Sequence, residues 1–138
     1  MDSVDNSVGM SRFFLVVGAV LAGLAVIIGA FGAHALSAHL TDRGADIWNT
    51  AVQYQMFHSV GIIAVGILLL ILNAKKSLIL AGFAFLTGTI LFSGSLYTIA
   101  LVSVKNLGLV TPVGGLCFIV GWLLLVVAAM ASTRIRTL

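Results

Sequence analysis

Charged residues are scarce in this chain of 138 residues. They make up 8% of the sequence, whereas a soluble domain carries about 25%. Hydrophobic residues make up 61%, and the mean hydropathy is +1.22. A soluble core of this size could not bury so much apolar surface, so lipid must be the solvent for most of it. The composition therefore predicts an integral membrane protein of one domain.

Cysteine and clustered basic residues are scarce as well. The single cysteine, Cys117, excludes an intrachain disulfide and any Cys-x-x-Cys metal or redox motif. The net charge is only +3, and the positive residues are scattered along the chain. This distribution argues against a nucleic-acid partner.

Acidic residues are missing from the long apolar stretches, since all four lie outside them, at Asp2, Asp5, Asp42 and Asp46. No buried carboxylate is therefore available as a general base or a proton relay. The chain also has no Gly-x-Ser-x-Gly, no His-Glu-x-x-His and no phosphate-binding loop. We therefore expect no enzymatic activity, no catalytic residue and no cofactor.

Four apolar stretches are each long enough to cross a bilayer, which takes about 20 helical residues for ~30 Å of hydrocarbon. In chain order they cover residues 13–33, 53–72, 78–102 and 111–131. A transmembrane domain of residues 12–133 would follow a flexible tail, 1–11, and precede a basic tail, 134–138. The sequence predicts an all-α membrane protein, an antiparallel bundle of four transmembrane helices.

Threonine and serine mark the expected helix starts. Ser11 and Thr41 are candidate N-caps of the first and second helices. At the fourth helix, Thr111 would be the N-cap and Pro112 the first helical residue. Polar turns at residues 73–77 and 105–108 would separate the later spans.

Positive residues divide unevenly between the two sides of such a bundle. Four spans put both termini on one side, together with the turn that contains Lys75 and Lys76. That side carries five positive residues against two on the other, and these are Arg12, Lys75, Lys76, Arg134 and Arg136 against Arg43 and Lys105. The positive-inside rule then predicts that both termini are cytoplasmic.

Small residues recur at helical spacing in three spans, and small residues allow membrane helices to approach closely. The first span has Gly18, Ala22, Ala25, Gly29 and Gly32, the third has Ala81, Ala84, Gly88 and Ser95, and the fourth has Gly114, Gly121 and Ala128. Cys117 lies on the fourth stripe and is expected to be a small core residue. These stripes predict tight packing between the helices.

Polar side chains gather at one level of the predicted bilayer. At ~1.5 Å per helical residue, His58 lies about 21 Å from the cytoplasmic boundary and His34 about 31 Å. The same count brings polar groups of all four helices into the outer half, and we call this set the polar belt: His34, Gln53, Tyr54, Gln55, His58, Ser93, Ser95, Tyr97 and Thr111. His58 should point into the bundle. Its hydrogen-bond partner would come from another helix, where Ser93 and Ser95 are the candidates, or from Tyr54 or Gln55 of its own helix.

Three interpretations of the polar belt remain open. The favoured one is a network of interhelical hydrogen bonds, each worth about 0.6–2 kcal/mol. The second is a polar vestibule, open to the outer face, that binds a ligand, a proton or a cofactor. A metal or haem site using His34 and His58 is the weakest, because their ~10 Å difference in depth fits a single ion poorly. No metal is therefore predicted.

Three strings resemble a known family. They are residues 29–36 (GAFGAHAL), 50–58 (TAVQYQMFH) and 92–97 (FSGSLY), the last followed by TPVGG at 111–115 and by Gly121-Trp122. In kind and order they resemble the YgdD-like family of small inner-membrane proteins, relatives of transmembrane protein 256 (domain of unknown function 423). The resemblance covers roughly residues 12–131. It implies a four-helix protein of the bacterial inner membrane and carries over no catalytic residue.

These observations predict a small integral membrane protein with a structural or accessory role. Its partners would be the lipid bilayer and either further copies of itself or a larger membrane complex. The alternative is a small transport or ligand-binding protein that uses the polar belt. A single four-helix bundle has little room for a pore, so transport would require an oligomer.

Overall fold

The computed structural model describes residues 2–72, 75–102 and 105–132 of the chain. The helices in these ranges are α1 (Asp2–His34), α2 (Asp42–Ile71), α3 (Lys75–Gly88), the π-helix η1 (Thr89–Ser93), α4 (Gly94–Val102), the 3₁₀ helix η2 (Lys105–Leu109) and α5 (Val110–Ala131). Because η1 joins α3 and α4 without a break, the three form one long helical rod.

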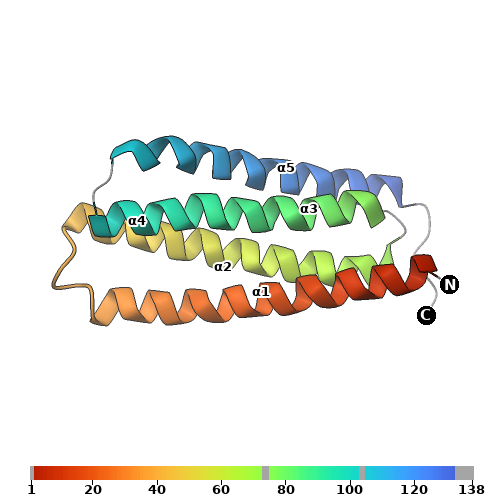
Figure 1. Ribbon diagram of the computed structural model, residues 1–138, viewed down its shortest axis with the longest axis horizontal. Coiled ribbons are helices and arrows are strands. Elements are labelled where there is room, and N and C mark those ends of the chain that lie inside the picture. The colour runs from red at the N-terminus through yellow and green to blue at the C-terminus, as the bar shows by residue number, and fades with distance from the viewer. Residues whose placement is uncertain (1, 73–74, 103–104, 133–138) are drawn as a thin grey trace.

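Four helical segments are long and apolar enough to cross a membrane: Ser7–His34, Asp42–Ile71, Lys75–Val102 and Leu107–Ala131. They lie side by side along the longest axis of the molecule (Figure 1). The start of α1 and the end of α5 lie at the same end of this bundle. The prediction of four apolar helices, each long enough to cross a membrane, is confirmed.

The two middle helices hold the bundle together. α2 packs along α1 on one side and along the rod of α3, η1 and α4 on the other. α5 packs against α3 and η1, while α1 barely touches α3. α1 and α5 therefore form opposite edges of the molecule, as Figure 1 shows.

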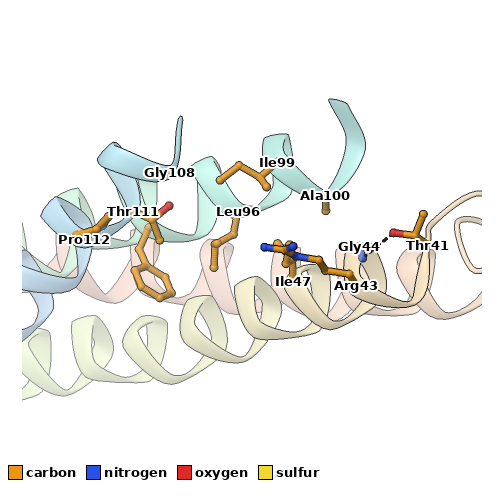
Figure 2. Close-up of a pocket in the computed structure, with 11 residues that line it drawn as sticks. Thr41, Arg43, Gly44, Ile47, Leu96, Ile99, Ala100, Gly108, Thr111 and Pro112 are labelled. Carbon is orange, nitrogen blue, oxygen red and sulfur yellow. Dashed lines mark hydrogen bonds between the residues drawn. The ribbon is translucent and has the colours of Figure 1, made fainter. Parts of the chain in front are cut away.

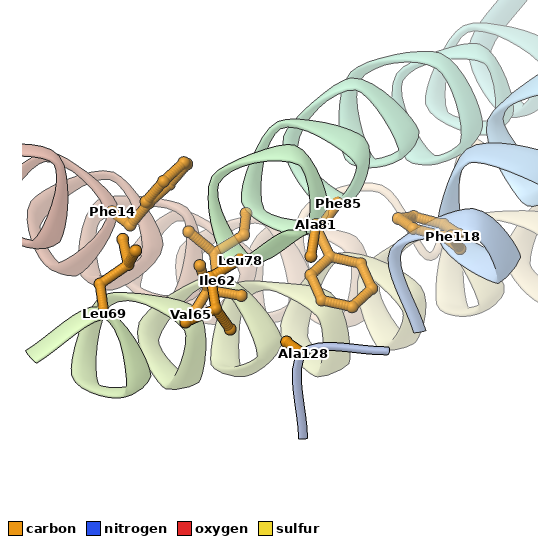
Figure 3. Close-up of a cluster of buried hydrophobic side chains, with 9 residues drawn as sticks. All are labelled: Phe14, Ile62, Val65, Leu69, Leu78, Ala81, Phe85, Phe118 and Ala128. Carbon is orange, nitrogen blue, oxygen red and sulfur yellow. The ribbon is translucent and has the colours of Figure 1, made fainter. Parts of the chain in front are cut away.

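The apolar core lies in the half of the bundle toward the start of α1. All four long helices contribute to it: its buried members are Phe14, Ile62, Val65, Leu69, Leu78, Ala81, Phe85, Phe118 and Ala128 (Figure 3). Phe14 packs edge-on to Phe83, with ring centroids 5.3 Å apart. This half is therefore packed mainly by apolar side chains, whereas the polar belt lies in the other half.

Glycines lie where helices approach most closely. A Cβ on Gly121 would lie 2.5 Å from the ring of Phe85, and a Cβ on Gly18 would lie 2.9 Å from the backbone oxygen of Ser59. A Cβ on Gly114 would overlap the backbone of Phe92. Each contact needs the absent side chain, so α1–α2 and α3–α5 approach through glycine.

The first helix begins earlier than the sequence indicated. Residues 2–10, expected to be part of a flexible tail, form the first turns of α1. The prediction that Ser11 is an N-cap is wrong, because the residue lies inside the helix. Its buried hydroxyl donates to the Gly66 backbone oxygen at 2.6 Å, where a glycine on α2 lets α1 come close.

The other two predicted caps had opposite outcomes. Thr41 is the N-cap of α2, and its hydroxyl accepts from the Gly44 backbone N–H at 3.1 Å. Thr111 is not a cap, because α5 begins at Val110 directly after η2, which occupies the turn predicted at 105–108. A residue already inside a helix cannot cap it. Residues 73–74 of the other predicted turn and the tail at 134–138 lie outside the described residues.

Candidate functional site

Gln55 lies at the centre of the polar belt. It is only 4% exposed and points from α2 toward two other helices. Its Nε2 donates to the Leu21 backbone oxygen of α1 at 2.9 Å. Its Oε1 accepts from the Tyr97 hydroxyl of α4 at 2.9 Å. One side chain thus ties three helices together at the same depth.

The serines of the third span use the backbone and a threonine. Ser93 donates to the Ala51 backbone oxygen of α2 at 2.9 Å. The Ser95 hydroxyl lies 2.7 Å from the Thr111 hydroxyl of α5 and also donates to the Phe92 backbone oxygen. Residues two apart on a helix face opposite ways, so Ser93 reaches α2 while Ser95 reaches α5.

The π-helix η1 sets the rotation of the residues that follow it. A π-helical turn bonds residues five apart and so holds one residue more than an α-helical turn. The wide turn carries Phe92, whose backbone packs directly against Gly114 of α5. Every later residue is rotated by the extra residue, which brings Tyr97 onto Gln55. η1 was not among the elements predicted from the sequence, and no simple periodicity marks it.

His58 is buried and uses both ring nitrogens. Nδ1 lies 2.8 Å from the Tyr54 backbone oxygen, and Nε2 lies 3.2 Å from the Trp122 indole nitrogen. Because an indole N–H can only donate, Nε2 must be the acceptor and Nδ1 must carry the proton. The ring also stacks on Phe118, with centroids 3.5 Å apart. His58 is therefore a neutral imidazole with satisfied nitrogens.

The expected cross-helix partners of His58 were wrong. Ser93 and Ser95 lie at the expected level but bond to Ala51 and Thr111 instead. Trp122 of α5 is the actual partner. Counting residues gives depth along the bundle, but it does not give the rotation of each helix about its own axis.

Three members of the polar belt lie outside this network of hydrogen bonds. His34 is exposed at the end of α1. Gln53 is exposed on α2, and Tyr54 is 42% exposed with its ring stacked 4.4 Å from Phe92. In the described parts of the chain, no group of three or more His, Cys, Asp or Glu residues could hold a metal ion. His34 and His58 are not brought together.

Two tryptophans join the network although the predicted belt did not include them. Trp48 donates to the Ile28 backbone oxygen at 3.2 Å, and its ring lies 4.8 Å from that of Tyr97. Gly32 makes room for it on α1. The sequence did contain a signal for Trp48, because its seven-residue spacing from Gln55 places the two side chains on the same face of α2. For Trp122, the only signal in the sequence was its position next to Gly121.

Two hollows flank the polar belt. The outer cavity, of about 730 Å³, lies between the start of α2, α4 and the start of α5 (Figure 2). It is lined by Thr41, Arg43, Gly44, Ile47, Phe92, Leu96, Ile99, Ala100, Gly108, Thr111 and Pro112. The lateral groove, of about 860 Å³, runs between α2 and α5 over His58, Phe57 and Trp122.

Comparison with known proteins identifies the family. The sequence profile described as "Protein of unknown function (DUF423)" matches residues 28–115. This chain belongs to the DUF423 family. The UPF0382 membrane protein YwdK of Bacillus subtilis (strain 168) is 42% identical over 119 residues, which cover 86% of this chain and 97% of that protein. No solved structure matches the chain.

Two further UPF0382 membrane proteins are similar to about the same degree. The UPF0382 membrane protein SERP0230 of Staphylococcus epidermidis is 43% identical over 121 residues, covering 86% of this chain and 96% of that protein. SH2409 of Staphylococcus haemolyticus is 40% identical over 119 residues, covering 85% and 94%. The predicted family is thus confirmed, and the chain is a membrane protein of a family without an assigned role. The profile match spans the whole predicted polar belt, from His34 to Thr111.

Proposed function

We propose that this DUF423 protein is a structural or accessory membrane protein that associates with further copies of itself or with a larger membrane complex, and that it catalyses no reaction. The observation that carries this proposal is that one face of α1, the face turned away from α2, is exposed. α1 packs along α2 and barely touches α3, so within residues 2–72, 75–102 and 105–132 one side of this long apolar helix has no packed neighbour.

That face of α1 carries small residues. Ala19, Gly23 and Ala30 are exposed, and a Cβ on Gly23 would meet nothing within 4 Å. The steps of four and seven residues keep them on one side of the helix. α1 also exposes bulky side chains, Val16, Val26 and Ile27, and the exposed face of α5 carries Leu116, Ile119 and Leu123. Since small residues favour helix association in lipid, α1 is the better candidate for an interface.

The internal pairing of the polar belt supports a non-enzymatic role. In the described part of the molecule, every buried side-chain nitrogen or oxygen atom has a hydrogen-bond partner. Catalytic acids, bases and nucleophiles need an atom that is free to reach a substrate. The rival function, transport or ligand binding through the belt, would need the same free atoms. Gln55, His58 and Ser93 use theirs to join helices.

We also propose that the four helices form an antiparallel bundle in the bacterial inner membrane, with both termini in the cytoplasm. The charge division of five positive residues against two supports this orientation. The common position of the start of α1 and the end of α5 in Figure 1 agrees with it.

Cysteine cross-linking in native membranes tests the association. In a Cys117→Ala background, Gly23→Cys should form a disulfide between two copies on mild oxidation. The reason is that the exposed face of small residues on α1 would lie against the same face of a second copy. Val120→Cys, on the exposed face of α5, is the matched control and should stay monomeric. Equal cross-linking of both variants would indicate random collision and would contradict a specific α1 interface.

A missing Gly23 cross-link has a different meaning if the protein belongs to a larger complex. Isolation in lipid particles cut directly from the membrane would then give a mass above that of one chain. A particle that contains a single chain and no other protein, together with no cross-link, would overturn the proposal.

A further inference from the structure

Arg43 is a charged side chain with no hydrogen bond or ion pair to the residues that the structure describes. It lies in the first turn of α2 and lines the outer cavity. In the described part of the chain it makes no ion pair, and its acidic neighbours on α2, Asp42 and Asp46, are exposed and do not line the cavity. Figure 2 shows its nitrogen atoms directed along α2 beside Ile47 and away from Thr41. The guanidinium thus extends over the cavity rather than away from it.

The two hollows adjoin each other. Phe92 and Pro112 line both the outer cavity and the lateral groove. Phe92 lies on the π-helix η1, where its ring stacks on Tyr54. A path past these two residues would lead from the outer cavity into the lateral groove, whose walls include Phe57, Leu116 and Trp122. The path leads from a cationic end to an apolar one.

The length of this path matches one leaflet of a bilayer. Arg43 and His58 are 15 residues apart on α2, which is about 22 Å along a helix. Half of a bilayer, headgroups included, is also about 20–22 Å thick. A cationic group at the outer end and an apolar groove reaching the depth of His58 therefore have the polarity and the length of one lipid molecule.

We propose that the outer cavity and the lateral groove together bind one anionic phospholipid. The phosphate would lie beside Arg43, and one acyl chain would pass Phe92 and Pro112 into the lateral groove. A guanidinium is suited to phosphate because its fork of N–H donors can form paired, charge-assisted hydrogen bonds. The position of Arg43 in the first turn of α2 adds the positive end of the helix dipole. This inference does not depend on the accessory role.

Lipid titration of the purified full-length protein, followed by native mass spectrometry, tests the site. The two probes are dioleoyl phosphatidylglycerol and dioleoyl phosphatidylcholine, which have the same chains and differ in headgroup charge. The wild-type protein should retain one phosphatidylglycerol at least about tenfold more tightly, the size expected for a charge-assisted hydrogen bond. Arg43→Gln should abolish this preference, and Arg43→Lys should keep part of it.

Three further arms of the experiment separate binding at this site from non-specific electrostatic attraction between the protein and anionic lipid. Lys76→Gln removes one exposed charge at the other end of the bundle and should leave the preference unchanged. Leu116→Trp should fill the lateral groove and weaken retention of both lipids. Glycerol 3-phosphate, which is a headgroup without chains, should not compete at equal concentration.

Several outcomes would overturn the proposal. They are equal retention of the two lipids by the wild-type protein, equal losses in Arg43→Gln and Lys76→Gln, and full displacement of the lipid by glycerol 3-phosphate. Circular dichroism would check that each variant keeps its helix content. If Arg43→Gln lost it, the Leu116→Trp variant and the competition with glycerol 3-phosphate would still decide between a lipid site and none.

Discussion

Two glutamines two positions apart on α2 show how residue position decides a role. Gln55 is buried and bonds to α1 and α4, whereas Gln53 is exposed and lines the lateral groove. Two helical steps turn the chain by roughly 200°, so the two amides point to opposite sides. Residue type alone could not separate them, because both have the same donors and acceptors.

This pair gives a matched test of the polar belt. Gln55→Leu should lower the free energy of unfolding in detergent by about 1–2 kcal/mol, since it removes two interhelical hydrogen bonds and leaves the Tyr97 hydroxyl without its acceptor. Gln53→Leu should change it by less than about 0.5 kcal/mol, as surface substitutions usually do. Denaturant titration followed by circular dichroism measures both. Similar values for the two variants would mean that the Gln55 bonds add no stability.

Two adjacent glycines on α5 differ in how closely they approach the neighbouring helix η1. A Cβ on Gly114 would overlap the backbone of Phe92 in the π-helix η1, while a Cβ on Gly115 would lie 3.8 Å from the Phe92 ring, an ordinary contact. A backbone cannot move aside as a side chain can. Gly114 therefore fixes how closely α5 approaches η1, and the wide turn of η1 occurs at this contact.

Alanine substitutions at the two glycines test this contact. Gly114→Ala should lower the free energy of unfolding by roughly 1–3 kcal/mol, because the added methyl group forces α5 and η1 apart. Gly115→Ala should be neutral or should stabilise by up to about 1 kcal/mol, since alanine favours helix over glycine. Thermal unfolding in detergent would rank the variants. A Gly114→Ala protein as stable as the wild type would show that the helices can separate without cost.

At the scale of the whole molecule, the two halves of the bundle differ in their balance of packing and hydrogen bonding, although Ser11 also bonds to Gly66 in the apolar half. The half near the start of α1 is a close-packed apolar cluster built around Phe14, Phe85 and Phe118. The other half contains the interhelical hydrogen bonds of Gln55, Ser93 and Ser95. Lipid gives no hydrophobic drive between helices, so packing and these bonds together must fix the arrangement.

Reporter fusions test how the whole bundle is oriented. Green fluorescent protein is active only in the cytoplasm, and alkaline phosphatase only outside it. A fusion after Leu138 should be fluorescent without phosphatase activity, and a fusion after Lys105 should give the reverse, because the positive-inside rule places these ends on opposite sides. A fusion after Lys76 is the control for the cytoplasmic side. The same result at Leu138 and Lys105 would contradict a span between them and therefore the four-span arrangement.

The sequence by itself determined the four apolar spans and the membrane environment, and it predicted the level of the polar groups. These properties add up along the chain, because span length and depth depend only on composition and on ~1.5 Å of rise per residue. The N-cap at Thr41 was also predictable, since a cap is local chemistry within a few residues.

Only the tertiary structure decided which partner each polar group takes. His58 pairs with Trp122 rather than with Ser93 or Ser95 because partner choice depends on the rotation of each helix about its axis. That rotation follows from the contacts between helices, and the extra residue in η1 turns all of α4 by roughly 100°. Likewise, Ser11 bonds across to Gly66 because α1 and α2 touch there, over 55 residues of sequence separation. No local pattern carries that information.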